Sequence, residues 1–176
     1  MLVERPMTAD QLATAVGNAV AHELSSALER IRHCLDQLSD EQIWWRPKPG
    51  LNSIGNLLLH LCGNLRQWIV AGIGGASDFR HRPGEFAERG PIPKAELISR
   101  LEAAVEESKA AITRITAQQL VEIRRIQGSE VTGLEAVFSS VPHFRGHTQE
   151  IVGMTRQQLG DAYRFAWTPA TPEQGA

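Results

Sequence analysis

The sequence predicts an all-α protein that folds as a four-helix bundle. Four segments repeat apolar residues at spacings of three and four, which is the period of a helix with one buried face. Stretches rich in Pro, Gly and charge, which are typical of loops, separate these segments. With 176 residues, of which 42% are hydrophobic, the chain is long enough to bury one core without disulfides. We expect one domain over residues 1–169 and a flexible tail over residues 170–176, which include Pro, Gly and Gln.

The first two helices are predicted from contrasting patterns. The first runs from about Thr8 to Leu38 and carries one apolar stripe. The second begins near Ser53, a residue suited to the N-cap, ends at the glycine-rich residues 72–75, and is apolar nearly all round. It is therefore expected at the centre of the bundle. The stripe of the first helix consists of Leu24, Leu28, Ile31, Leu35 and Leu38.

A long connection, residues 76–92, follows the second helix. It is rich in charge, Gly and Pro, and its length permits a crossover in place of simple up-and-down order. The third helix is predicted to start at Pro93, because proline is favoured in a first turn. Its heptad-like face consists of Leu97, Leu101, Ala104, Val105, Ser108, Ile112 and Ile115.

The last helix follows a less regular segment. Residues 120–131 mix β-branched and charged residues before a glycine, which is compatible with an extended, hairpin-like connection. The fourth helix opens with Thr132 and Glu135, a pair that fits a capping box, and runs to about Leu159. Pro142 lies inside it, so we expect a kink or a break there.

Composition excludes several functional classes. The formal net charge is −2, with 18 basic and 20 acidic residues, and aromatic residues make up 6%, so neither a phosphate-binding surface nor a base-stacking platform for nucleic acid is expected. The most apolar stretch, residues 51–73, includes His60, Asn64, Arg66 and Gln67 and is too polar for a membrane span. No signal peptide is evident, and Cys34 and Cys62 are expected as core residues of a cytoplasmic protein.

The second helix carries its polar groups in one narrow stripe. Asn56, His60, Asn64 and Gln67 follow spacings of four, four and three, which places them on one face of an α-helix. Buried polar groups without partners cost about 1–3 kcal/mol each, so this stripe must be satisfied by something. A hydrogen bond from His60 to a carbonyl group is one explanation, and a ligand is the other.

The fourth helix carries a second candidate pattern. His143 and His147 are four residues apart, so one face presents both imidazoles, and Glu150 shares that face. The pair could also lie by chance on an exposed face, because a lone H-x-x-x-H is a weak signal. Neither H-E-x-x-H nor the Glu-x-x-His of di-iron bundles is present.

Taken together, the two helices supply three neutral imidazoles. Three protein ligands and a water make an open metal site of the catalytic type, and His60, His143 and His147 are the candidate ligands. Imidazole suits Zn, Ni, Fe and Cu, so the residues alone do not choose the metal.

Three blocks of the chain, in this order, also carry a family resemblance. They are residues 37–41 with Trp45-Arg46-Pro47, the pattern S-I-x-x-L-x-x-H-L-x-G-N-L-R at 53–66, and H-x-x-x-H-x-x-x-I-V at 143–152. Together they resemble the DinB-like (DNA-damage-inducible) superfamily, and most closely its uncharacterised DUF1572 branch. The resemblance covers roughly residues 20–165.

This resemblance implies an up-down-down-up four-helix bundle that is often dimeric. It also carries a metal triad over onto His60, His143 and His147. Members of the superfamily include thiol-dependent transferases and a mycothiol-dependent maleylpyruvate isomerase. The resemblance therefore implies a divalent metal, most readily Zn or Ni, and a small-molecule substrate such as a low-molecular-weight thiol.

The chain departs from the family pattern next to the second histidine of the pair. Gly146 stands where relatives commonly have an aromatic residue, and Gln149-Glu150 stand where they commonly have Gly-Gln. Glu150 could bind the metal, orient an imidazole, act as a base, or be a solvated surface residue. Asn64 and Gln67 could hydrogen-bond a substrate or only fill the polar stripe.

Two hypotheses of function follow. The first is a metal-dependent enzyme of hydrolase or thiol-transferase type, in which the metal activates water or a small thiol. The second is a non-catalytic bundle that binds metal or a partner, such as a dimeric scaffold in a stress response. DNA repair is disfavoured by the acidic charge balance.

Overall fold

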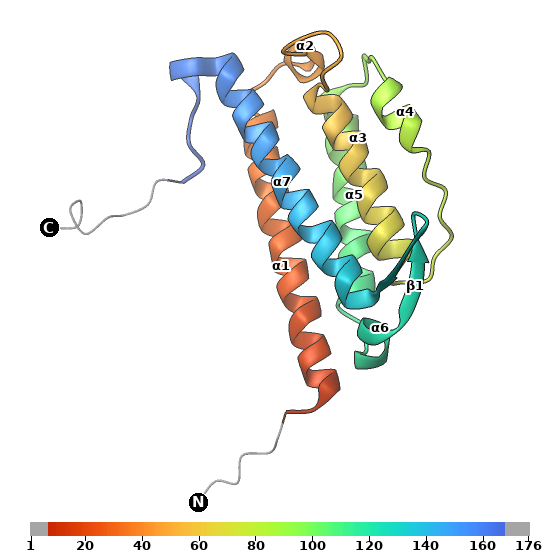
Figure 1. The fold of residues 1–176 in the computed structure, drawn as a ribbon. Helices are drawn as coiled ribbons and strands as arrows, with labels where there is room; N and C mark the ends of the chain where they lie inside the picture. The colour runs from red at the N-terminus through yellow and green to blue at the C-terminus, as the bar shows by residue number, and fades with distance from the viewer. Residues whose placement is uncertain (1–6, 168–176) are drawn as a thin grey trace, which may run out of the picture.

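The computed structural model describes residues 7–167, and the tail expected at 170–176 lies outside them. Four long helices form a bundle: α1 (Ala9–Leu35), α3 (Ile54–Leu65), α5 (Lys94–Ile112) and α7 (Gly133–Leu159). In Figure 1, α1 and α7 run toward the upper end of the bundle, whereas α3 and α5 run toward the lower end. The predicted four-helix bundle is therefore confirmed, in up-down-down-up order.

This order requires a crossover. Because α3 and α5 are parallel, the connection has to run from the end of α3 back along the bundle to the start of α5. Residues 76–92 make this connection along the outside of α3 (Figure 1). The sequence predicted only a loop here, but the segment contains a short helix, α4 (Arg82–Ala87), that packs against α3. Pro83 lies in the first turn of α4, where the missing N–H costs nothing.

Shorter elements close both ends of the bundle. The helix α2 (Asp40–Trp44) lies between α1 and α3, α6 (Ala117–Val121) follows α5, and a 3-10 turn, η2 (Gly160–Ala162), follows α7. The third long helix begins at Lys94, one residue later than predicted, because Pro93 has the extended backbone of an N-cap. The first ends at Leu35, three residues earlier than predicted, and a turn carries Leu38 into the core.

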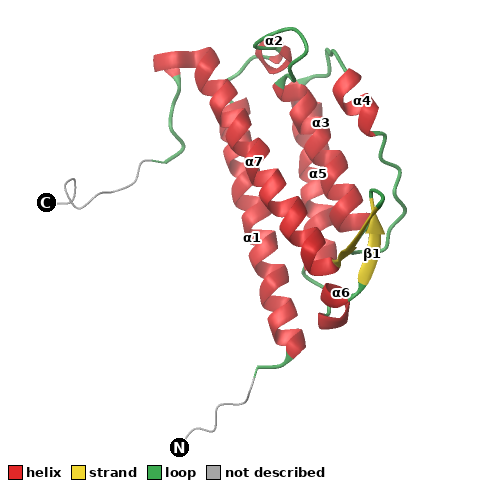
Figure 2. Cartoon of the chain, in the orientation of Figure 1, coloured by secondary structure: helices red, strands yellow, loops and turns green. Residues whose placement is uncertain are grey.

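The segment before α7 is the hairpin that the sequence suggested. Strands β1 (Ile123–Ile126) and β2 (Ser129–Thr132) pair antiparallel, with Ile126 opposite Ser129 (Figure 2). The turn residues Gln127 and Gly128 have φ of +52° and +84°, the left-handed conformation that two-residue hairpin turns require. The ring nitrogen of Trp68 donates a hydrogen bond of 3.2 Å to Gln127 Oε1, which ties the turn to the bundle.

Helix ends explain where the site-bearing helices begin. The hydroxyl groups of Ser53 and Thr132 accept from the backbone of Asn56 and Glu135, which confirms the predicted N-cap and the predicted capping box; Ser53 and Asn56 form a second complete box that was not predicted. Helix α3 continues into a π-helical turn, η1 (Arg66–Ala71), before the expected glycine stop. The wider turn changes the direction of the side chains beyond Leu65.

Pro142 does not break the fourth helix. Helix α7 is continuous from Gly133 to Leu159, with Pro142 in its interior and on its exposed side. The expected break at Pro142 is therefore absent. The missing hydrogen bond falls on the solvent side, where water can satisfy the free carbonyl group.

The core lies along the contacts of α1 with α5 and α7, and of α3 with α5. Cys34 and Cys62 are buried free cysteines, as predicted. None of the helices between residues 7 and 167 combines the length and apolar character needed to cross a membrane. The largest fully buried side chains include Phe144, Leu24, Ile31, Leu35, Leu57, Leu61 and Leu65.

The closest approach between α1 and α5 depends on Gly17. A Cβ atom there would lie 2.3 Å from the carbonyl oxygen of Ile112. We predict that Gly17→Ala lowers the free energy of unfolding by about 1–3 kcal/mol, because the helices must separate. Gly153→Ala is the matched control, since nothing lies within 4 Å of its Cβ position, and it should be neutral or stabilising. Urea titration measures both; equal stabilities would contradict this packing.

Candidate metal centre

Three imidazoles from two helices meet between α3 and α7. His60 on α3 and the pair His143 and His147 on α7 each offer one nitrogen, and these atoms all lie within 4.8 Å of one another. The rings are nearly perpendicular, with centroid distances of 5.0 Å (His60–His143), 5.2 Å (His60–His147) and 4.5 Å (His143–His147). The predicted trio is therefore brought together by the fold.

His60 is oriented by a carboxylate from the crossover. Its Nδ1 lies 2.9 Å from Oε2 of Glu85 in α4, and both side chains are buried. Because a carboxylate accepts hydrogen bonds, Glu85 favours the tautomer of His60 that has its proton on Nδ1 and its lone pair on Nε2; Nη2 of Arg80 also lies 3.0 Å from Nδ1. That nitrogen lies 2.9 Å from His143 Nε2 and faces the other two rings.

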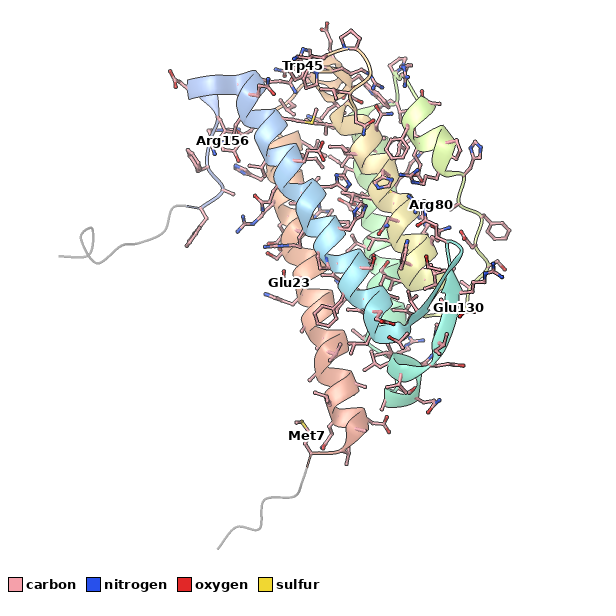
Figure 3. All side chains as sticks on the ribbon, in the orientation of Figure 1. Met7, Glu23, Trp45, Arg80, Glu130 and Arg156 are labelled. Atoms are coloured by element: carbon pink, nitrogen blue, oxygen red, sulfur yellow. The ribbon has the colours of Figure 1, made fainter. Side chains whose placement is uncertain are left out.

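Glu85 is itself held by a buried arginine. Arg80 binds Glu85 in a bidentate manner: Nε donates to Oε1 at 2.7 Å, and Nη2 donates to Oε2 at 2.9 Å. The exposed fractions of the two side chains are 3% and 9%. Burial acts to raise the pKa of Glu85, but hydrogen bonds from Arg80 and His60 outweigh it and hold this pKa below its usual value. Figure 3 shows Arg80 beside α3.

A glycine allows this approach of α4 to α3. A Cβ atom on Gly63 would lie 2.0 Å from Oε1 of Glu85 and 2.9 Å from Nε of Arg80. Only glycine at this helix position leaves room for the ion pair. Gly63, Arg80 and Glu85 thus form one unit that aims His60.

His147 has a carboxylate partner of its own. Its Nδ1 lies 2.7 Å from Oε2 of Glu150, one turn further along α7, and this pair is more exposed than that of His60. The same reasoning places the proton of His147 on Nδ1 and leaves Nε2 free. Of the roles considered for Glu150, the geometry shows the one in which it orients an imidazole.

His143 remains neutral in this setting. Burial, together with the nearby charges of His147, His60, Arg80 and Arg82, lowers the pKa of His143 from 6.5 to about 4. A metal ligand must offer an unprotonated nitrogen. At neutral pH protons therefore compete little with a metal for the nitrogen of His143.

The donor set fits a divalent metal. Two nitrogens bound to one zinc at about 2.0–2.1 Å in tetrahedral geometry lie about 3.3–3.4 Å apart. The observed 2.9 Å between His60 Nε2 and His143 Nε2, and the limit of 4.8 Å for the trio, bracket that spacing. Carboxylates on the outer nitrogens of His60 and His147 are the arrangement that metal-binding histidines usually have. The three-histidine group could hold a metal ion.

Asn64 and Gln67 have different environments. Asn64 is buried, and its Oδ1 accepts a hydrogen bond of 2.9 Å from the hydroxyl group of Ser140. Gln67 lies in the π-helical turn, where its amide donates to Asp78 at 2.8 Å and accepts from Arg80 at 2.9 Å. The two ends of Gln67 are therefore used by Asp78 and Arg80, whereas Asn64 lines a cavity.

This cavity, of about 200 Å³, opens onto His60 and His143. It lies between α3, the start of α4, the turn of the hairpin and α7. Its other lining residues are Asn64, Trp68, Arg80, Arg82, Gln127 and Ser139. A small molecule in this space would lie next to the imidazoles.

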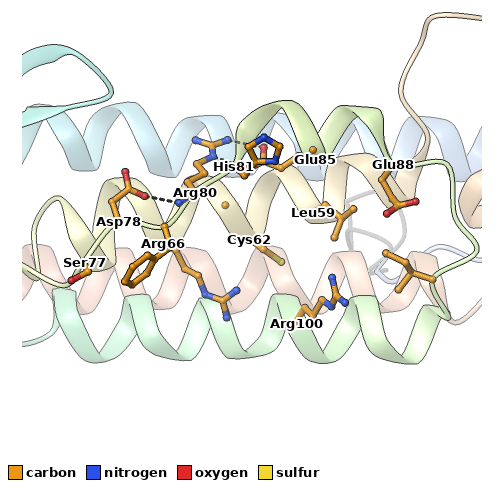
Figure 4. Close-up of a pocket in the computed structure, with 14 residues that line it drawn as sticks. Leu59, Cys62, Arg66, Ser77, Asp78, Arg80, His81, Glu85, Glu88 and Arg100 are labelled. Atoms are coloured by element: carbon orange, nitrogen blue, oxygen red, sulfur yellow. Dashed lines mark hydrogen bonds and ion pairs between the residues drawn. The ribbon is translucent and has the colours of Figure 1, made fainter.

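A larger pocket, of about 500 Å³, lies on the other side of Glu85, between α3, α5 and the crossover (Figure 4). It contains Cys62 and Arg100 but none of the three histidines. Burial raises the pKa of Cys62 to about 12, so its thiol stays protonated and unreactive at neutral pH. Cys62 points away from the metal centre, as the helical phase predicted.

Sequence reasoning missed Arg80, Glu85 and Gly63. Arg80 and Glu85 lie in the charged crossover, where nothing separated them from solvated loop residues. The available signal was local: Arg82-Pro83 begins a helix, and an acid in its first turn follows. That signal predicts α4 but not the direction in which Glu85 points.

Comparison with solved structures agrees with the fold. A DinB-like four-helix bundle is also seen in solved structures. A conserved protein from Enterococcus faecalis has a TM-score of 0.66 and 21% identity, over 80% of this chain and 95% of that one. A DinB-like protein from Bacillus cereus has a TM-score of 0.62 and 17% identity, over 80% of this chain and 91% of that one. A DinB-like protein from Bacillus subtilis has a TM-score of 0.61 and 15% identity, over 80% of this chain and 92% of that one.

These identities show a shared fold and no more. The family itself is shown by sequence: the model of DUF1572, a family described as proteins of unknown function, matches residues 11–170. The chain belongs to the DUF1572 family. No curated protein matches it.

The carboxylate on His60 should control metal affinity. We predict that Glu85→Gln weakens zinc binding by about 10- to 100-fold, because it removes the charge that fixes the imidazole and leaves Arg80 unbalanced. Competition with a chromogenic chelator measures the affinity. Glu107→Gln, which removes an exposed ion pair with Arg66, is the control and should bind as the wild type does. Equal affinities for all three proteins would show that Glu85 has no such role.

Acid should destabilise the metal-free protein. The pKa of His143 is lowered from 6.5 to about 4, so below about pH 6.5 the unfolded chain binds a proton that the folded chain rejects. The free energy of unfolding should therefore fall as the pH drops from about 6.5 to 4. Urea titrations across this range should show a shallower fall for His143→Gln. Identical slopes would mean that His143 titrates normally.

Proposed function

We propose that this protein is a metal-dependent enzyme that binds one zinc or nickel ion at His60, His143 and His147. The observation that supports it best is the convergence of three imidazoles of which two are each oriented by a carboxylate. Structural zinc sites are closed by four protein ligands, whereas a catalytic site keeps one position open. Three histidines beside a cavity correspond to the open, catalytic type of site.

A bound divalent metal would lower the pKa of a coordinated water or thiol and make it a nucleophile near neutral pH. The chain's own carboxylates aim two of the imidazoles at one point: Glu85 acts on His60, and Glu150 acts on His147. Glu150 is half exposed, so its carboxylate can also exchange a proton directly with solvent.

The nucleophile has to come from outside the chain. Burial raises the pKa of Cys34, and that of Cys62 to about 12, so neither cysteine is a thiolate at neutral pH. This supports water or a low-molecular-weight thiol as the attacking group, in a hydrolase or a thiol transferase. The cavity of about 200 Å³ limits the part of the substrate next to the metal to a small group.

A dimeric scaffold without catalysis is the second candidate. One observation favours it: Phe138 is 70% exposed on α7, beside an apolar groove of about 260 Å³ between α1 and α7. A second copy of the chain could cover this face. In that case the histidines would hold a structural metal, and no substrate would turn over.

Metal analysis of untagged protein tests the proposal. We expect one metal ion per chain, and less than about a tenth of that content in the double variant His60→Ala/His147→Ala, because one remaining imidazole binds weakly. The control His22→Ala/His33→Ala removes two histidines from α1 and should keep the metal. Conjugation of a small thiol to an electrophile by the metal-restored protein then separates enzyme from scaffold.

Unchanged metal content in the double variant would overturn the metal site. Full metal content without turnover of any thiol or ester tested would favour the scaffold.

A further inference from the structure

The cavity beside the imidazoles has an unbalanced positive charge. Arg80 and Arg82 both line it, and none of its described lining residues is acidic. Arg80 is already paired with Glu85, so its charge is compensated inside the protein. The charge that remains belongs to Arg82.

Arg82 begins α4 and has donors to spare. Its guanidinium group lies over the ring of Phe86, 5.0 Å from the ring centre, which fixes its direction. It is exposed, and it makes no ion pair or side-chain hydrogen bond with another residue of the described range 7–167. Arginine donates from a planar fork that matches the two oxygens of a carboxylate.

Asn64 adds a second free donor to the same cavity. The side chain is 7% exposed, and its Oδ1 is occupied by the hydroxyl group of Ser140. Its Nδ2 has no acceptor within the described part of the chain. This nitrogen is not fully enclosed by protein atoms and belongs to a side chain that lines the cavity, so an acceptor in the cavity can reach it.

We propose that this cavity binds a substrate with a single carboxylate group, which lies between the guanidinium group of Arg82 and the amide of Asn64. The inference rests on the proposed function in one respect: the other end of the substrate reaches the three imidazoles. A volume of about 200 Å³ holds about six or seven water-sized groups, which suits a short carboxylic acid. One uncompensated guanidinium group and one amide match a charge of −1 better than the two charges of a phosphate.

Side-chain NMR of the full-length protein tests this directly, with butyrate as the probe and butyramide as its uncharged match. Butyrate should shift the Arg82 Nε–H and Asn64 Nδ2–H signals, and bind at least about ten-fold more tightly than butyramide. Arg82→Gln should remove this preference. Arg125→Gln, which changes an exposed arginine on β1 outside the cavity, should retain it.

Asn64→Asp is the second variant, because it keeps the acceptor for Ser140 and places an oxygen where the donor was. It should abolish butyrate binding. Equal binding of butyrate and butyramide, an unchanged preference in Arg82→Gln, or tighter binding of inorganic phosphate than of butyrate would each overturn the proposal.

The titrations are repeated on metal-free protein, which separates this site from the metal centre. Butyrate binding that depends on Arg82 without metal supports the carboxylate site even if metal analysis fails. Metal binding without a preference for butyrate supports the metal centre alone.

Discussion

The carboxylate of Glu85 is the group on which the arrangement of the site depends. It accepts hydrogen bonds from Arg80 and from the imidazole of His60, in a region where all three side chains are buried. A buried charge is tolerated only when it is paired and hydrogen-bonded. Because Glu85 comes from the crossover and His60 from α3, the hydrogen bond between them both joins the crossover to the bundle and sets the direction of the His60 imidazole.

The rest of the site follows from this anchor. The crossover carries Arg82 to the edge of the cavity, and the hairpin turn at Gln127, tied to Trp68, borders the same space. The pair formed by His147 and Glu150 is more exposed than the pair formed by His60 and Glu85, because Glu150 is half exposed whereas Glu85 is buried. The three-histidine group thus has a buried side formed by α3 and α4, and a more exposed side formed by α7.

The bundle and its histidine trio were predictable because helical periodicity is local. Spacings of three and four place His60 in a polar stripe and His143 and His147 on one face, and the sequence shows the capping box of α7 and the N-cap of α3. Glu85 was not predictable, because its direction depends on the contact of α4 with Gly63, and no periodicity links a crossover to a helix. Gln67 changed its role because the chain beyond Leu65 forms a π-helical turn, which alters the phase that an α-helix would give.

The central claim is that one cation is shared by three imidazoles, and a crystal structure of zinc-loaded protein with anomalous scattering recorded at the zinc edge tests it most directly. The account predicts a single peak between α3 and α7, about 2.0–2.1 Å from one nitrogen of each ring, with a fourth position open to the cavity. A peak elsewhere, or one that lacks His60, would contradict it.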